Sequence, residues 1–168
     1  MSEIVIINGT GTSGKDEVIN IIKKYRRVFN YSTIDYIKNI MIHHFGWDGI
    51  SKNDKDRYLM SELKRLATEY NDGPINFTKQ YFNNMNIEKF DFIFIHCREC
   101  EEINKLNEYF KNSKRLLVHR RLTINFNNNS DMQVYECEYD YIINNTGDLD
   151  YLEQLCINFI NTIEQESD

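Results

Sequence analysis

The first 24 residues constrain the fold more than any other part of the chain. A β-branched apolar run at residues 4–7 leads into a glycine-rich stretch at residues 9–14, and a segment with helical apolar spacing follows at residues 16–24. A strand, a tight turn and a helix in immediate succession favour a βα unit, in which the strand lies in a parallel sheet. We therefore expect an α/β protein.

The glycine spacing within this unit has a physical reason. Glycines let the backbone adopt positive φ, so that successive amide N–H groups can point into one concavity and bind phosphate oxygens. The helix that begins near Gly14 adds the partial positive charge of its N-terminus, and Lys15 adds a full charge. The pattern Gly9-x4-Gly14-Lys15 in this context predicts a loop that binds the phosphates of ATP.

Asp16 stands where such loops carry a Ser or Thr whose hydroxyl coordinates Mg²⁺. A carboxylate is also a hard oxygen ligand, so Asp16 is a candidate Mg²⁺ ligand. It can alternatively serve only to favour the first turn of the helix electrostatically. The predicted cofactor-binding residues in this segment are Gly9, Gly11, Thr12, Ser13, Gly14, Lys15 and Asp16.

Length, charge and hydropathy exclude several classes of protein. The 168 residues suit one domain, and the net charge of −6 disfavours a protein that coats a nucleic acid polymer. No apolar run is long enough to cross a bilayer, and no signal-peptide pattern opens the sequence, so we expect a cytoplasmic protein with small-molecule partners. Either a monomer or a homodimer is compatible with this composition.

The four cysteines are Cys97, Cys100, Cys137 and Cys156. In the cytoplasm they are expected to be reduced thiols. Cys97-x2-Cys100 has the spacing of a metal or redox motif, but no second close pair accompanies it. Burial as small apolar side chains is the interpretation we favour.

Four further strands alternate with helices along the chain. The strands are predicted at 28–33, 90–96, 115–119 and 139–144, and the helices at 34–42, 55–70, 75–86, 97–110 and 149–163. This alternation predicts a three-layer α/β/α fold with a central parallel five-stranded sheet. We expect one domain over 1–168, with a helical insertion at about 35–87 and a flap at about 122–138.

Charged residues follow two of these strands directly. Arg98 and Glu99 come after the strand at 90–96, and Arg120 and Arg121 come after the strand at 115–119. The carboxyl ends of parallel strands face the ligand crevice of such sheets, so these residues are placed for chemistry. His96 occupies the strand end where many phosphate-loop enzymes hold Mg²⁺ with an aspartate, which leaves Asp16 or Glu99 for that role.

Several blocks together resemble the nucleoside monophosphate kinases. The resemblance is strongest to the group with S-G-K-D in the loop, which includes phage deoxynucleoside monophosphate kinases and animal-type phosphomevalonate kinase. The matching blocks are residues 9–16, 34–38, 98–99 with 101–103, 120–121, and 140–147 with Leu149 and Leu152.

The resemblance implies an ATP- and Mg²⁺-dependent transfer of phosphate to a small phosphorylated acceptor. Lys15, Arg98, Arg120 and Arg121 would act on the transferring group, Asp35, Lys38, Arg57 and Arg98 would surround the acceptor, and Asn145 and Gly147 would border the adenine. Aromatic residues at Tyr31, Tyr36 and Trp47 favour a nucleobase in the acceptor, because they can stack on one. Two alternatives remain: the acceptor is a non-nucleotide phosphate, or the protein is a nucleotide-binding module with little catalysis.

Overall fold

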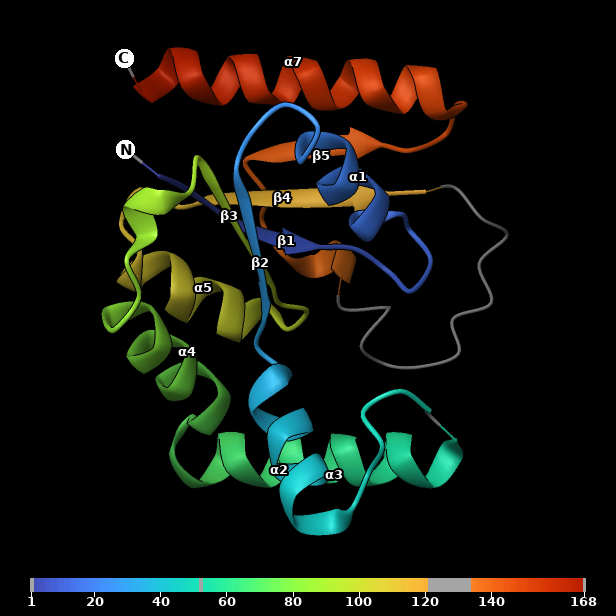
Figure 1. The fold of residues 1–168 in the computed structure, drawn as a ribbon, viewed down its shortest axis with the longest axis vertical. Coiled ribbons are helices and arrows are strands. Elements are labelled where there is room, and N and C mark those ends of the chain that lie inside the picture. Colours follow the sequence, from blue (N-terminus) through green and yellow to red (C-terminus); the bar gives the residue numbers. More distant parts are fainter. Residues whose placement is uncertain (1, 52, 121–133, 168) are drawn as a thin grey trace. The chain divides into compact units, whose positions relative to one another are not determined.

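The computed structural model describes residues 2–51, 53–120 and 134–167 of the chain (Figure 1). Two compact units are present, Met1–Tyr31 with Ile87–Asp168 and Ser32–Asn86. The elements of the first unit are β1 (Glu3–Asn8), α1 (Lys15–Ile22), β2 (Val28–Ser32), which ends at the border with the second unit, η1 (Ile87–Lys89), β3 (Phe92–His96), α5 (Cys100–Tyr109), β4 (Lys114–His119), η2 (Val134–Glu136), β5 (Tyr141–Asn144) and α7 (Leu149–Ser167). Those of the second unit are α2 (Asp35–Phe45), α3 (Asp54–Asn71) and α4 (Gly73–Asn83).

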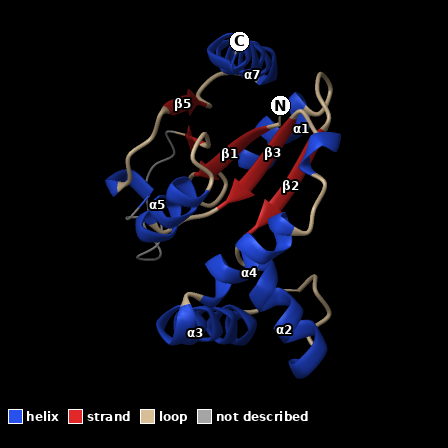
Figure 2. Cartoon of the chain, turned by 90° about the vertical axis from the view of Figure 1, so that its left-hand side faces the viewer, coloured by secondary structure: helices blue, strands red, loops and turns tan. Residues whose placement is uncertain are grey.

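The strands form one five-stranded sheet in the order β2-β3-β1-β4-β5. β1 pairs in parallel with β3 and with β4, and β4 pairs in parallel with β5. β2 lies at the edge beside β3 and points the same way in Figure 2. The predicted parallel five-stranded sheet is confirmed.

The central strands are continuous apolar runs because helices cover both of their faces. Val5, Phe94 and Val118 belong to a buried cluster with side chains of α1 and α7. On the opposite face α5 buries Ile103 and Leu106 (Figure 2). The result is the predicted three-layer α/β/α arrangement.

The second unit has a small core of its own. Ile37, Met41, Trp47 and Met60 pack together there, and Asn53 caps α3 in a reciprocal capping box with Asp56. α4 begins at Gly73, earlier than the predicted residue 75, because Pro74 fits the first turn of a helix, where its missing N–H is not needed.

Two strands begin later than predicted, and a residue that forms an ion pair lies directly before each of them. Asp91 binds the backbone N–H and guanidinium of Arg27, and β3 begins after it. Asp140 likewise binds Arg115, and β5 begins after it. The strand predictions at 90–96 and 139–144 are therefore too long by about two residues at their amino ends.

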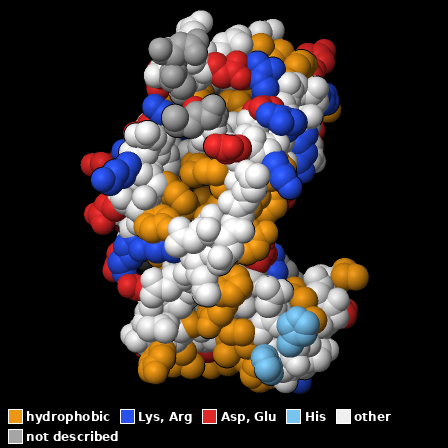
Figure 3. Space-filling model, turned by 60° about the vertical axis from the view of Figure 1, so that its left-hand side comes forward, with side chains coloured by type: hydrophobic (Ala, Val, Ile, Leu, Met, Phe, Trp, Pro, Cys, Tyr) orange, Lys and Arg blue, Asp and Glu red, His pale blue; other side chains and the backbone are white. Residues whose placement is uncertain are grey.

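Charges of both signs lie close together on the molecular surface. On the face shown in Figure 3, Lys and Arg side chains are interspersed with Asp and Glu. Among the helices of the described ranges, none combines the length and apolar character that a membrane-spanning helix requires.

Candidate functional site

The glycine-rich segment connects β1 to α1 at the carboxyl edge of the sheet. Gly14 has φ +95° and ends the segment directly before α1, and a Cβ atom there would lie 2.3 Å from Asn145 Nδ2. At Gly9 a Cβ atom would lie 2.5 Å from both Ser13 Oγ and Val118 O. Side chains at these two positions would collide with their neighbours, which explains why the loop requires glycine there.

Lys15 folds back over the loop that precedes it. Its Nζ donates hydrogen bonds to Gly9 O at 2.6 Å and to Thr10 O at 2.8 Å. The ammonium group is therefore held beside the same backbone that the sequence predicts to bind phosphate. Asp16, the next residue, lies exposed in the first turn of α1.

Ser13 carries a buried hydroxyl that is not satisfied. The residue is 1% exposed, and its Oγ has no hydrogen-bond partner within the described residues. A buried polar group of this kind costs about 1–3 kcal/mol unless a partner is supplied. An anionic oxygen in the loop would supply that partner, so the residues present fit a bound phosphate group.

Asn145 lies directly against this loop, on the turn after β5. Its Nδ2 donates to Ser13 O at 3.0 Å, and its backbone N–H donates to His119 O at 2.7 Å. Gly147, two residues further on, stands so close to Tyr151 that a Cβ would lie 2.6 Å from the ring. The structure therefore brings Asn145 to the loop; its predicted contact with adenine stays a prediction.

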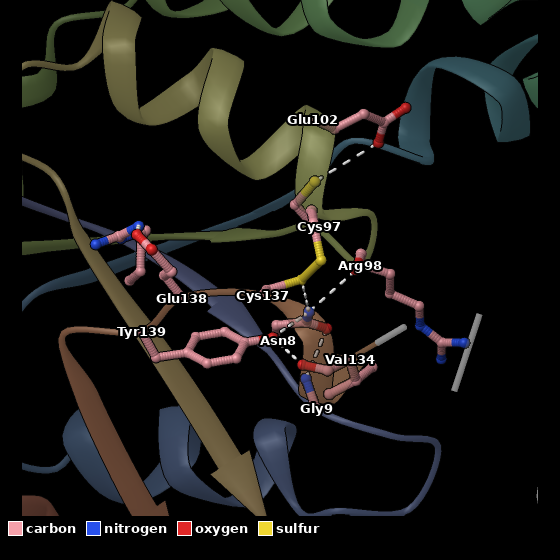
Figure 4. Close-up of a disulfide and its surroundings, with 11 residues drawn as sticks. Asn8, Gly9, Cys97, Arg98, Glu102, Val134, Cys137, Glu138 and Tyr139 are labelled. Atoms are coloured by element: carbon pink, nitrogen blue, oxygen red, sulfur yellow. Dashed lines mark hydrogen bonds and ion pairs between the residues drawn. A yellow bond between two sulfur atoms is a disulfide. The ribbon is translucent and has the colours of Figure 1, made fainter. Parts of the chain in front are cut away.

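Asn8 is a fully buried polar residue that sequence reasoning missed as part of the site. Its Oδ1 accepts a hydrogen bond from Gly9 N at 2.8 Å, and its Nδ2 donates to Arg98 O at 3.0 Å and to Tyr139 Oη at 2.7 Å (Figure 4). Asn8 thus joins the loop to the segments after β3 and before β5. The available signal was the single amide side chain that directly follows the apolar run at residues 4–7.

Tyr139 completes this polar group. Its hydroxyl donates to Val134 O at 2.6 Å. Burial raises the pKa of Tyr139 to about 12, and the hydrogen bond from Asn8, which favours the phenolate, opposes that rise only in part. Tyr139 is therefore a neutral phenol over the physiological pH range.

The structure contradicts the expectation of four reduced thiols. Cys100, the first residue of α5, and Cys137 form a disulfide with a Cα–Cα distance of 5.1 Å, across 37 residues of sequence. Cys97 and Cys156 are buried thiols, as expected. The prediction was wrong for the pair because it rested on an expected compartment, whereas the pairing depends on which segments the fold brings together.

The other predicted residues of the first unit lie at strand or helix ends. Arg98 is exposed after β3, with its side chain directed away from Asn8 in Figure 4, and Arg120 is exposed after β4. Glu99 is the N-cap residue of α5 and lies close to the Cys97 thiol and the Glu102 carboxylate. Arg121 and residues 122–133 of the predicted flap lie outside the described residues.

Three predicted acceptor residues belong to the second unit. Lys38 Nζ contacts Asp35 Oδ1 at 2.6 Å, so these two form an ion pair one turn apart on α2. Arg57 lies in the first turn of α3, where its backbone N–H donates to Asn53 O. Trp47 is 8% exposed in the core of this unit and cannot stack on a ligand, which corrects its suggested role.

Comparisons with known proteins identify the fold. A scan against protein-family models found no match, and a search of curated proteins found none either. Among solved structures, dephospho-CoA kinase from Campylobacter jejuni is 18% identical with a TM-score of 0.57 over 100% of both chains. A sugar kinase from Janibacter sp. is 12% identical with a TM-score of 0.55, over 96% of this chain and 95% of the other.

Shikimate kinase from Bacteroides thetaiotaomicron gives a third comparison, with 12% identity and a TM-score of 0.50 over 96% of this chain and 98% of the other. At such identities the likeness establishes the fold alone. Together with the strand order, it shows that the chain has the α/β/α fold of these three structures.

Proposed function

We propose that the protein is an ATP-dependent kinase of a small phosphorylated acceptor, with a deoxynucleoside monophosphate as the first candidate. The observation that carries the proposal is the loop at residues 9–15. It combines a left-handed Gly14 at a helix N-terminus, an ammonium group held over the loop, and the unsatisfied hydroxyl of Ser13. These are the groups that a triphosphate would engage.

The chain's own groups would act mainly by position and charge. The loop amides would bind the donor phosphates, and Lys15 would exchange its two carbonyl contacts for phosphate oxygens of the transferring region. Arg98 and Arg120, both exposed at the carboxyl edge, would balance negative charge on the transferring group, as would Arg121. Fixing donor and acceptor in line is the principal contribution of such a site.

Mg²⁺ fits Asp16 better than Glu99. Asp16 is an exposed carboxylate next to Lys15, and a hard oxygen ligand is what Mg²⁺ prefers. Glu99 shares its surroundings with the Cys97 sulfur, and the ligand atoms of the two lie within 4.8 Å of one another; sulfur is a poor neighbour for this ion. When bound, Mg²⁺ would neutralise charge on the triphosphate.

A cavity within the second unit supports a nucleobase in the acceptor. Its volume is about 460 Å³, and it is lined by Phe77, Gln80, Tyr81, Asn84 and Met85. Two aromatic rings beside two side-chain amides can stack on a base and hydrogen-bond its edge. This chemistry favours a nucleotide over an aliphatic phosphate such as phosphomevalonate, and Asp35, Lys38 and Arg57 remain the proposed acceptor contacts of the same unit.

A coupled assay of ADP formation tests the proposal. We expect ATP turnover that depends on one or more deoxynucleoside monophosphates and that falls at least about 100-fold in Lys15→Ala, because a phosphate-binding charge is removed from a desolvated site. Lys23→Ala is the matched control: it removes the same charge from the C-terminal end of α1. ADP formation that is indifferent to every acceptor would contradict a kinase of this type.

One observation favours a second function. His96, and not a carboxylate, ends β3, so the aspartate that commonly holds Mg²⁺ at this strand end is missing. A nucleotide-binding module with little catalysis would then bind ATP, and calorimetry would detect ATP binding without acceptor binding or turnover.

A further inference from the structure

Three cysteines lie together near Asn8, the residue directly before the loop at residues 9–15. Cys100 and Cys137 are joined by the disulfide, and Cys97, which follows β3 directly, carries a buried thiol. The Cys97 thiol donates to Glu102 Oε2 at 3.5 Å, and Glu102 is itself only 4% exposed. A buried thiol and a buried carboxylate thus form a donor and acceptor pair next to a disulfide.

The arrangement has the parts that thiol–disulfide exchange requires. Figure 4 shows the Cys97 sulfur beside the disulfide, with the sulfur bonded to Cys137 lying between the two. Attack proceeds in line with the S–S bond and expels the far sulfur. The far sulfur is Cys137 Sγ, and Asn8 Nδ2 lies 4.0 Å from it as a hydrogen-bond donor.

We propose that these residues form an internal exchange centre in which Cys97 displaces Cys137 from Cys100. Glu102 accepts the proton of Cys97, and the resulting thiolate forms the Cys97–Cys100 bond with its electron pair. The Cys100–Cys137 bond breaks, and its electron pair leaves on Cys137. The proton held by Glu102 returns through solvent to the Cys137 thiolate, so one thiol and one disulfide are present before and after, and no external oxidant or reductant is consumed.

The exchange would change how the segment before β5 is held. In the observed state Cys137 fastens this segment to the first residue of α5. After exchange the covalent link lies within residues 97–100, and noncovalent contacts hold the segment, among them the Asn8–Tyr139 hydrogen bond and the Arg115–Glu138 ion pair.

An effect on the phosphate loop follows if the proposed function is correct. The Asn8 side chain donates to Cys137 and Tyr139 and accepts a hydrogen bond from Gly9 N–H. A change at Cys137 therefore reaches the first backbone amide of the loop through Asn8. We expect ATP to bind about fivefold more weakly in the exchanged form, the equivalent of one hydrogen bond.

Alkylation of the folded protein tests the exchange directly. The protein is purified without reductant, treated once with oxidised glutathione, freed of it, and incubated at pH 8 with iodoacetamide before acid quenching and peptide mapping. We expect alkylated Cys137 and a Cys97–Cys100 disulfide to accumulate together, because Cys137 is accessible once released whereas Cys97 is buried. A persistent Cys100–Cys137 disulfide without that product, or no Cys100–Cys137 disulfide after oxidation, would overturn the proposal.

Three variants separate exchange from accidental labelling. Cys97→Ala should abolish alkylation of Cys137, and Glu102→Gln should slow it at least about tenfold, because the base is lost. Cys156→Ala is the matched control, since Cys156 is also a buried thiol but packs against Val18 of α1, and burial raises its pKa to about 12. It should leave the rate unchanged.

The mapping needs no nucleotide, so it can fail independently of the proposed kinase function. Far-UV circular dichroism checks that Cys97→Ala is folded, and Glu102→Gln carries the test if it is not. Exchange at the same rate in Glu102→Gln would refute the assigned role of the carboxylate. Exchange in a protein that does not bind ATP would contradict the proposed function and leave the exchange centre intact.

Discussion

Gly14→Ala tests the geometry of the loop without any ligand. Gly14 has φ +95°, and holding an L-residue in a left-handed conformation costs roughly 1–2 kcal/mol. The added Cβ would also lie 2.3 Å from Asn145 Nδ2, the atom that donates to Ser13 O at 3.0 Å. Displacing that donor costs about 1 kcal/mol. We therefore expect the free energy of unfolding to fall by about 2–3 kcal/mol.

Urea denaturation and thermal melting measure this loss. For a chain of this length, 2–3 kcal/mol corresponds to a fall in Tm of about 5–10 °C. Gly11→Ala is the matched control, because a Cβ at Gly11 would have no atom within 4 Å, and we expect a change below about 0.5 kcal/mol. In an Asn145→Ala background the Gly14 substitution should cost about 1 kcal/mol less, since the colliding amide is gone. Equal losses for the Gly11 and Gly14 variants would refute the reasoning.

Two further substitutions probe groups whose pKa the fold shifts. Hydrogen bonds from Arg27 lower the pKa of Asp91 to about 2, so its contribution to stability is present above pH 4 and is lost as pH falls towards 2. Asp91→Asn should lower the free energy of unfolding by about 1 kcal/mol at pH 7, because the ion pair is partly exposed. In urea titrations, the difference in unfolding free energy between this variant and the wild type should narrow between pH 4 and pH 3. A difference that stays constant would contradict this. Tyr139→Phe removes the bonds to Asn8 and Val134 and should cost about 1–3 kcal/mol. Because burial raises the pKa of Tyr139 to about 12, its contribution to stability is present below pH 10 and is lost as pH rises through 12. The difference in absorbance at 295 nm between wild type and variant should show one tyrosine that ionises at a higher pH than a free tyrosine. Ionisation of this tyrosine at the usual pH would refute the assignment.

The layers of the fold could be predicted because local pattern and burial agree. The runs ending at Ile7 and Ile95 are apolar at consecutive positions, which only a strand covered on both faces requires. The loop at 9–15 was predicted for the same reason, since the glycine positions, the preceding strand and the following helix are all local features. The observed close approaches at Gly9 and Gly14 are the physical basis of that pattern.

What the sequence did not disclose depends on contacts between distant segments. The disulfide joins the start of α5 to a residue 37 positions later, and nothing in the spacing of the cysteines selects this pair. Asn8 and Tyr139 are separated by 131 residues, and their contact depends on the pairing of β4 with both β1 and β5, which no local pattern discloses. Trp47 was suggested as a ligand contact because an aromatic ring can stack on a base, but its side chain belongs to the buried cluster of Met41 and Met60.

Calorimetric titration of the folded protein with ATP and Mg²⁺ tests the central claim that residues 9–15 bind a nucleoside triphosphate. We expect saturable binding to the wild type, unchanged binding to Lys23→Ala, and at least about tenfold weaker binding to Lys15→Ala, because a charge-assisted contact to phosphate contributes about 1.5–3 kcal/mol. Equal affinity of Lys15→Ala and wild type, or no binding to the wild type at millimolar ATP, would contradict the account.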